Sequence, residues 1–405
     1  MSNNSISSLY PFCRLVVEKF DMHYSFQLEE KACFVTLRPD ERYTPVCHEC
    51  ESEAEVIHSW HKRRLRDISL ADFPTVVILH YRKIKCPECD SYKVEKLGIK
   101  SPGGPAVTDR MARKLFEHCQ QTSGEATAKK YKLDWKTVKT IDKRFLEEKF
   151  GEIDYGHSGY LMIDEVTRGD FHQYFTIVAD YETSRVIWVG KGRRFDTLDK
   201  FFSDMPEGKK QDIRAVAMDM WDPYIKAVKM HCPQAEIVHD KFHIIAKYSG
   251  VIDKVRRNEQ KEKEEQKDLI KGSRWLLLKN LENLSDEQKE ELEELLQVNE
   301  NLNIVYILKD ALKEIFNRRS FSPIKERINY FIDLAKEADL KPLNNFISTL
   351  NNYMSGIVAY SKYPIHTSKL EGINNKIKEI KRVAFGYRDT SYFKLKIKQA
   401  FPGKS

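Results

Sequence analysis

The chain contains 405 residues, too many for one ordinary hydrophobic core, so we expect two to four domains. Its 41% hydrophobic and 32% charged residues are typical of a soluble globular protein, and its net charge of +7, from 68 Lys and Arg against 61 Asp and Glu, weakly favours a polyanionic partner. The sequence has no apolar run of about 18 residues and no secretion-signal pattern, which excludes a membrane-spanning helix, and we expect a cytoplasmic protein with no membrane partner.

Two Cys-x-x-Cys pairs lie in the first 100 residues, which are otherwise rich in alternating runs that suit small β-hairpins. The pairs are Cys47 with Cys50 and Cys86 with Cys89. Each pair forms a tight knuckle, and the chain between the knuckles can bring four thiolates to one tetrahedral ion. The sequence therefore predicts a structural Zn²⁺ in a small zinc ribbon.

Two alternatives to this zinc site stay open. The pairs could be redox dithiols or unrelated thiols, although neither lies at the strand-to-helix junction of a thioredoxin-like motif. One of three nearby histidines, His48, His58 or His61, could also replace a thiolate. Between the knuckles, we expect Arg63 and Arg64 to contact DNA phosphates.

A linker rich in Pro and Gly, Ser101–Pro105, separates this segment from three short predicted helices. Thr108, Ser123 and Asp134 stand where the N-caps of these helices are expected, and the last helix runs over Trp135–Phe150. One face of that helix is apolar, and its other face carries Lys136, Lys139 and Lys143. This pattern favours a helix-turn-helix whose last helix enters a DNA major groove, with a plain helical connector as the alternative.

From Tyr160 onward, the pattern changes to strands and helices in the order β-β-β-α-β-α-β. The expected strands span residues 160–163, 171–179, 185–189, 213–218 and 236–239, and the expected helices span 196–202 and 223–230, the second capped by Asp222. This order favours a ribonuclease-H-like mixed sheet over a doubly wound nucleotide-binding fold, which would open β-α-β. In such a sheet the first and fourth strands are neighbours.

The next region is nearly all helical in pattern and has an apolar core of its own, which predicts an insertion before the last helices. The predicted fold is thus multidomain α/β: a ribonuclease-H-like mixed sheet with a large all-helical insertion, preceded by a zinc ribbon and a helix-turn-helix. The expected boundaries are residues 1–100 for the ribbon, 101–155 for the helix-turn-helix, 156–245 with 360–405 for the sheet domain, and 246–359 for the insertion.

Three carboxylates are the candidate metal-binding residues in this predicted fold. Asp164 ends the first strand, Asp219 ends the fourth, and Glu371 lies in the first turn of a later helix. Neighbouring strand ends place the two aspartates side by side, and two such carboxylates repel each other unless a hard cation, Mg²⁺ or Mn²⁺, binds between them. An apolar face on the later helix would bring Glu371 to the same edge, where Lys378 and Arg382 would face a DNA backbone.

Each carboxylate also has an ordinary explanation. Aspartates commonly end strands and cap the following turn, and Ser368-x-x-Glu371 is a capping box at a helix start. Asp240, directly after the last strand, is the rival of Asp219 as the second metal ligand. We prefer Asp219 because its strand should lie beside the first.

Several longer motifs surround these acids. They are Ile163-Asp164-Glu165-Val166, Met218-Asp219-Met220-Trp221-Asp222-Pro223-Tyr224, His239-Asp240-Lys241-Phe242-His243, Val255-Arg256-Arg257, Leu370-Glu371-Gly372-Ile373-Asn374-Asn375-Lys376-Ile377-Lys378, Arg382 and Gly386-Tyr387-Arg388. Through them the chain resembles bacterial insertion-sequence transposases of the ISL-three family. The resemblance covers nearly the whole chain, because that family also begins with a zinc ribbon and a helix-turn-helix.

The resemblance implies that Asp164, Asp219 and Glu371 are DDE ligands of two metal ions and that the four paired cysteines hold zinc. It implies a nucleoid-associated bacterial DNA transposase that binds the terminal inverted repeats of an insertion sequence. As a homodimer or higher oligomer, it would cleave these ends and join them to double-stranded target DNA. One metal would activate water and later a DNA 3′-hydroxyl, and the other would stabilise the leaving oxygen. A non-catalytic zinc-dependent DNA-binding regulator and a hydrolytic nuclease of the same fold stay as alternatives.

Overall fold

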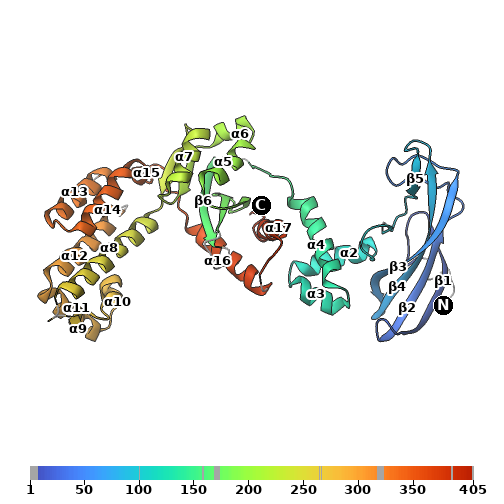
Figure 1. Cartoon of the computed structure of the whole chain (residues 1–405), viewed down its shortest axis with the longest axis horizontal. Coiled ribbons are helices and arrows are strands. Elements are labelled where there is room, and N and C mark those ends of the chain that lie inside the picture. The colour runs from blue at the N-terminus through green and yellow to red at the C-terminus, as the bar shows by residue number, and fades with distance from the viewer. Residues whose placement is uncertain are drawn as a thin grey trace. The chain divides into compact units, whose positions relative to one another are not determined.

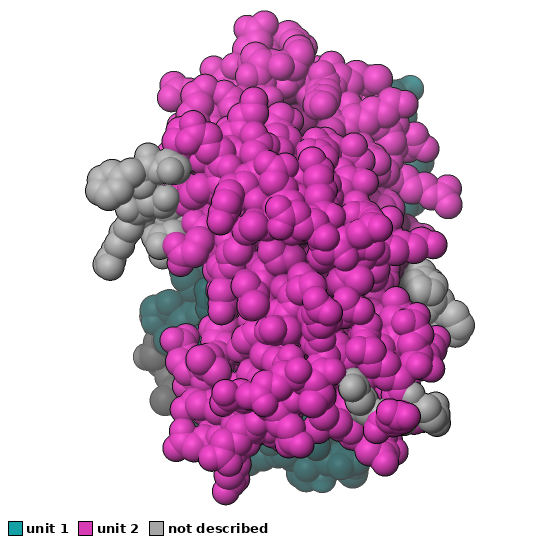
Figure 2. Space-filling model, turned by 90° about the vertical axis from the view of Figure 1, so that its left-hand side faces the viewer, with its two compact units in different colours: residues 1–152, 381–395 teal, residues 153–380, 396–405 magenta. Residues whose placement is uncertain are grey.

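The computed structural model describes residues 8–99, 101–156, 159–167, 174–263, 265, 267–316, 323–384 and 386–403. The chain forms two compact units, residues 1–152 with 381–395 and residues 153–380 with 396–405 (Figure 2). Figure 1 shows the helices and strands and labels many of them. In the described part of the chain, no helix combines the length and the apolar composition that a membrane crossing needs.

The first unit begins with a five-stranded sheet. Its strands are β1 (Leu15–Ser25), β2 (Glu30–Pro39), β3 (Ile57–Leu70), β4 (Phe73–Cys86) and β5 (Ser91–Val94). They lie in the order β1-β2-β4-β3, with β5 also on β4, and β2 pairs with β4 in parallel. Alternate residues such as Val35, Leu37 and Leu79 are fully buried in one cluster. The predicted hairpins are present as the antiparallel pairs β1–β2, β3–β4 and β4–β5, and the β2–β4 pairing joins them into one sheet.

Three helices follow the linker, as predicted: α2 (Asp109–Cys119), α3 (Gly124–Tyr131) and α4 (Trp135–Phe150). The predicted N-caps are confirmed, because the side chains of Thr108, Ser123 and Asp134 each accept a hydrogen bond from a backbone N–H in the first turn. Apolar residues of all three helices pack in one buried cluster that includes Leu115 and Val138. The three helices thus share a core of their own.

The second unit is built on another five-stranded sheet. Its strands are β6 (Tyr160–Thr167), β7 (Tyr174–Asp180), β8 (Val186–Lys191), β9 (Ala215–Met218) and β10 (Glu236–His239). They lie in the order β10-β9-β6-β7-β8; β6, β7 and β8 pair antiparallel, and β9 pairs in parallel with both β6 and β10. The first and fourth strands are therefore neighbours, as predicted. Residues 171–173, the start of the predicted second strand, lie outside the described residues.

Helices α5 (Phe195–Ser203) and α6 (Glu207–Asp212) connect β8 to β9, and helix α7 (Asp222–His231) connects β9 to β10. The prediction that Asp222 caps α7 is wrong. Trp221 is the N-cap, because its carbonyl accepts the first helical hydrogen bond, from the N–H of Tyr224. Asp222 is instead the first helical residue, and its Oδ1 accepts a hydrogen bond of 2.8 Å from the Tyr353 hydroxyl.

The predicted insertion is helical where the structure describes it (Figure 1), and α8 begins at Lys241, soon after the end of β10. Its α-helices are α8 (Lys241–Glu262), α9 (Lys267–Ile270), α10 (Arg274–Leu278), α11 (Asp286–Val298), α12 (Glu300–Ile315), α13 (Ile324–Glu337), α14 (Lys341–Asn352) and α15 (Met354–Ala359). They share one buried apolar core, in which the rings of Tyr248, Phe331 and Phe346 contact one another edge to face.

Helices α16 (Ser368–Val383) and α17 (Thr390–Ala400) follow the insertion. The predicted apolar face of α16 is buried through Leu370, Ile373 and Ile377. The predicted capping box is wrong, because α16 already includes Ser368. Its hydroxyl pairs with Nδ1 of His366 rather than with a first-turn N–H.

We predict that Phe331→Ala lowers the free energy of unfolding of the second unit by about 3–5 kcal/mol, because it empties part of a packed core. Phe331 is 1% exposed, whereas its neighbour Tyr330 is 66% exposed. Tyr330→Ala is therefore the matched control, with an expected change within about 0.5 kcal/mol. Urea unfolding followed by circular dichroism measures both variants, and equal losses would contradict the helical core described above.

Candidate functional site

The two predicted aspartates lie at one edge of the second sheet. The parallel register pairs Ile163 with Met218, so the next residues along the two strands are Asp164 and Asp219. Met218 is the last residue of β9, but β6 continues to Thr167 because its pairing with β7 continues. Asp164 is thus inside its strand, not at its end as predicted. The shared register nevertheless brings the two aspartates level with each other.

Asp164 is held from two sides. Its Oδ1 accepts a hydrogen bond of 2.8 Å from the N–H of Glu165, and its Oδ2 accepts one of 2.9 Å from the Asn374 amide on α16. Burial raises the pKa of Asp164 to about 6; the charges of Glu165 and Asp219 add to this, whereas the Glu165 N–H and His243 oppose it. A carboxylate that is costly to ionise in this way is suited to a divalent cation, which supplies the missing positive charge.

The side chain of Asp219 is partly exposed to solvent. Its Oδ1 accepts a hydrogen bond of 2.6 Å from the N–H of Met220, and its Oδ2 lies 3.7 Å from Nδ1 of His243. The side chains of Asp219 and His243 are each 33% exposed. His243 belongs to the first turn of α8, so the start of this helix reaches the same edge of the sheet.

Glu371 is an exposed residue in the first turn of α16. Thr367, Glu371 and Asn374 are spaced by four and three residues, which places them on one helix face. Because Asn374 bonds Asp164, this face of α16 borders β6; Figure 1 shows the helix beside that strand. Among the described residues, however, the ligand atoms of the three predicted acids do not all lie within 4.8 Å of one another. The structure brings the aspartates to one edge and Glu371 to the adjoining helix face, without a closed ligand set.

Two further residues at this edge were not singled out from the sequence. Asn374 had one usable signal, its helical spacing from the predicted acid three residues earlier. Arg193 lies in the loop after β8, with its guanidinium 4.0 Å from the Tyr174 ring centroid and 4.9 Å from that of Trp221. Its Nη1 is 3.4 Å from Oε1 of Glu165, and this charge opposes the rise that burial causes in the pKa of Glu165. No sequence spacing reveals Arg193, because its contacts cross the sheet.

The four predicted cysteine ligands converge in the first unit. Their sulfur atoms all lie within 4.8 Å of one another, with Cys50 3.4 Å from Cys86 and Cys47 4.0 Å from Cys89. A tetrahedral Zn²⁺ with bonds of about 2.3 Å separates its sulfur ligands by about 3.8 Å, which this cluster matches. His48 does not join the cluster and contacts a backbone carbonyl 3.0 Å away. The geometry therefore favours four thiolate ligands.

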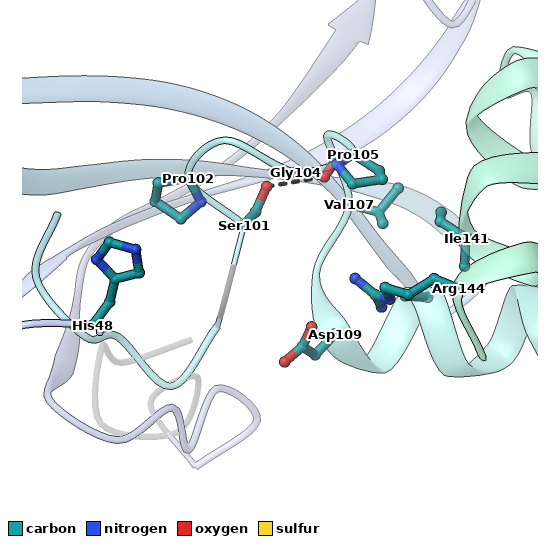
Figure 3. A pocket seen from close by; sticks show the side chains of 10 residues that line it. His48, Ser101, Pro102, Gly104, Pro105, Val107, Asp109, Ile141 and Arg144 are labelled. Carbon is teal, nitrogen blue, oxygen red and sulfur yellow. Dashed lines mark hydrogen bonds between the residues drawn. The ribbon is translucent and has the colours of Figure 1, made fainter. Parts of the chain in front are cut away.

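Arg63, one of the predicted DNA contacts, holds the linker turn. Its Nη2 donates to the carbonyl of Gly104 at 2.6 Å, and its Nη1 donates to that of Ser101 at 3.4 Å. Figure 3 shows the same turn, where the Ser101 hydroxyl bonds the carbonyl of Pro105, beside a cavity of about 240 Å³. None of the predicted acids or cysteine ligands lines this cavity. Arg64, by contrast, is exposed on β3.

Lys139 and Lys143 on α4 share one acidic partner. Their ammonium groups lie 3.0 Å and 3.2 Å from Oδ2 of Asp389. Burial raises the pKa of Asp389, but hydrogen bonds from the N–H of Tyr392 and from both lysines lower it to about 2. These two lysines therefore meet an anionic group within the first unit. The other predicted DNA contacts are exposed on helix surfaces: Lys136, Lys378 and Arg382.

We predict that Cys86→Ser lowers the zinc content from about one ion per chain to well below one, because a serine hydroxyl is a poor zinc ligand. Cys13→Ser is the matched control, since Cys13 is exposed and outside the cluster, and it should keep the wild-type content. Plasma emission spectroscopy after gel filtration measures the metal. Stoichiometric zinc in Cys86→Ser would contradict the four-thiolate site.

Similarity to known proteins covers most of the chain. The ISL3 transposase family matches residues 161–397, and the zinc finger of the transposases of IS204, IS1001, IS1096 and IS1165 matches residues 44–89. The chain is 38% identical over 364 residues to the transposase for insertion sequence element IS1001 of Bordetella parapertussis, covering 89% of each protein. It is 23% identical over 406 residues to the transposase for insertion sequence element IS1557 of Mycobacterium tuberculosis, covering 93% of this chain and 90% of that one. The chain therefore belongs to the ISL-three (ISL3) family of insertion-sequence transposases.

Proposed function

We propose that this transposase cleaves the ends of its insertion sequence and joins them to target DNA, with Asp164, Asp219 and Glu371 as its metal-binding acids. The observation that carries this proposal is the β6–β9 register, which brings the two aspartates level at one sheet edge. The hydrogen bond from Asn374 to Asp164 supports the third acid, because it ties the helix that bears Glu371 to the same edge.

The strand order supports a ribonuclease-H-like catalytic domain. Three antiparallel strands, β8-β7-β6, continue into two parallel strands, β9 and β10. In this order the first and fourth strands, β6 and β9, are neighbours near the centre of the sheet. Asp164 and Asp219, which are far apart in the sequence, therefore come close together. The proposed domains are residues 1–100, 101–155, 156–245 with 360–405, and 246–359. The last is the insertion, which separates the third acid, on α16, from the two aspartates in the sequence.

The donors at this edge fit Mg²⁺ or Mn²⁺. All three proposed ligands are carboxylates, which are hard oxygen donors, and the raised pKa of Asp164 reflects the cost of ionising it without a cation. When bound, two such ions would activate the attacking oxygen and stabilise the leaving oxygen of a phosphodiester. The N–H of Glu165 and the amide of Asn374 orient Asp164 for this role. Arg193, stacked on Trp221, offers a positive charge to a nearby phosphate.

DNA recognition is proposed for the first unit. The packing of α2, α3 and α4 suits a helix-turn-helix with α4 as the recognition helix, and Lys136 is exposed at its start. The zinc ribbon adds Arg64, and two small modules together give the larger footprint that terminal inverted repeats require. Lys378 and Arg382 would contact the DNA backbone beside the acids. Holding two element ends at once requires a homodimer or a higher oligomer.

Three variants test the acids: Asp164→Asn, Asp219→Asn and Glu371→Gln. Each should lower the rate of Mg²⁺-dependent cleavage and strand transfer at least about 100-fold, because each removes a ligand charge while nearly keeping the side-chain shape. Rates are measured on labelled DNA that carries the element ends. Glu379→Gln is the matched control on the same helix, since Glu379 is exposed and pairs with Lys376, and it should keep the wild-type rate.

Unchanged rates of cleavage and strand transfer in all three acid variants would contradict the proposal. Substrates with pre-nicked ends separate the two alternatives. A hydrolytic nuclease would give no joined product, and a non-catalytic regulator would bind the ends without cutting them.

Lys136→Ala should weaken binding to element ends and reduce the slope of log affinity against log salt concentration by about 1, because one phosphate contact is lost. Lys289→Ala, in α11, is the matched control, since this lysine pairs with Asp286 on the helical insertion, and its slope should match the wild type. Fluorescence anisotropy over a salt series gives both slopes. A wild-type slope for Lys136→Ala would remove the start of α4 from the proposed interface.

A further inference from the structure

Asp240 is a buried acid at the point where the chain leaves the second sheet. It follows β10, caps α8 and is 1% exposed. Its Oδ1 accepts a hydrogen bond of 2.9 Å from the N–H of Phe242. Its Oδ2 accepts two from Thr367, at 2.7 Å from the N–H and 2.8 Å from the hydroxyl. Since a carboxylate has about four acceptor sites, most of its capacity is already used by the protein.

Thr367 immediately precedes α16. Its carbonyl accepts a hydrogen bond of 3.3 Å from the N–H of Glu371, so Thr367 fixes the first turn of that helix. Thr367 lies four residues before Glu371, and Asn374 lies three residues after it, on one helix face. Glu371 therefore lies between two polar anchors, Thr367 on Asp240 and Asn374 on Asp164.

The insertion leaves the sheet and returns at this same point. Asp240 and Thr367 are 127 positions apart, and helices α8 to α15 lie between them. His243 adds a second link, since its Nε2 lies 3.3 Å from the Thr367 hydroxyl and its Nδ1 lies 3.7 Å from Asp219. Short polar contacts thus join the two ends of the insertion to each other and to the second aspartate.

We propose that Asp240 and Thr367 form a clamp that positions Glu371, and that Asp240 is not itself a metal ligand. The proposal rests on the proposed function, in which Glu371 is the third acid. The clamp joins two segments that are far apart in the sequence and holds the start of α16 at the end of β10, the strand that pairs with β9. Without it, Glu371 remains on its helix, but the residue that precedes this helix loses its hydrogen bonds to Asp240. Such supporting contacts typically change activity or metal affinity by about 10–100-fold.

Thr367→Val is the first test, because it removes the hydroxyl but keeps the side-chain shape and the backbone N–H. We expect kcat for strand transfer to fall about 10-fold, with KM for element-end DNA unchanged, and amide hydrogen exchange over residues 367–378 to accelerate. Thr367→Ser, which restores the hydroxyl, should recover both. Thr349→Val is the matched control, since that hydroxyl bonds the carbonyl of Asn345 within its own helix.

Asp240→Asn tests whether Asp240 is instead a ligand, with the number of Mn²⁺ ions bound per chain measured by electron paramagnetic resonance. The clamp predicts faster exchange over residues 367–378 with an unchanged number of bound ions. A ligand role predicts the loss of a bound ion with unchanged exchange, which would overturn the proposal. Wild-type exchange and kcat in Thr367→Val would overturn it equally.

The exchange measurement needs no catalysis, so the clamp and the proposed function can fail separately. If amide exchange in Thr367→Val is as slow as in the wild type while Glu371→Gln is inactive, the clamp alone is overturned. Full activity in Glu371→Gln would overturn the proposed function, and the positioning role with it, whatever the exchange rate.

Discussion

The parallel pairing of β6 with β9 is the constraint on which the candidate site depends. Its register sets Ile163 opposite Met218, and a slip of one residue would turn every side chain of the slipped strand to the other face. Both residues are fully buried in the core of the second unit, so hydrophobic packing specifies the register strongly. Asp164 and Asp219 therefore meet as a consequence of how the preceding apolar residues pack. Their own charges oppose the arrangement, and the fold holds them together despite that repulsion.

This opposition is visible in the electrostatics of the edge. The pKa of Asp164 is raised to about 6, first by burial and further by the charges of Glu165 and Asp219. The guanidinium of Arg193, 3.4 Å from Glu165, offsets part of this negative charge. A site with clustered acids and incomplete compensation is typical of a position where function, rather than stability, selects the residues. The helix that carries Glu371, the third proposed acid, is attached to the same edge through hydrogen bonds from Asn374 to Asp164 and from Thr367 to Asp240.

Signals within a few residues of one another made much of the fold predictable. The N-caps Thr108, Ser123 and Asp134 each act on their own first turn, and the apolar runs of the second sheet gave the strand order and hence the aspartate pair. Contacts between distant segments were not predictable in this way. The amide of Asn374 meets Asp164 across 210 positions, and Lys143 meets Asp389 across 246. Such contacts depend on how packed elements approach, which no local spacing records.

In the proposed function, the edge formed by β6, β9 and α16 binds the divalent cations of the reaction. Anomalous diffraction from crystals of the full chain grown with Mn²⁺ tests it most directly. We expect anomalous peaks within about 2.3 Å of carboxylate oxygens of Asp164 and Asp219, with a carboxylate oxygen of Glu371 as a further ligand. A manganese peak on Asp240, with none on Asp164 or Asp219, would contradict it.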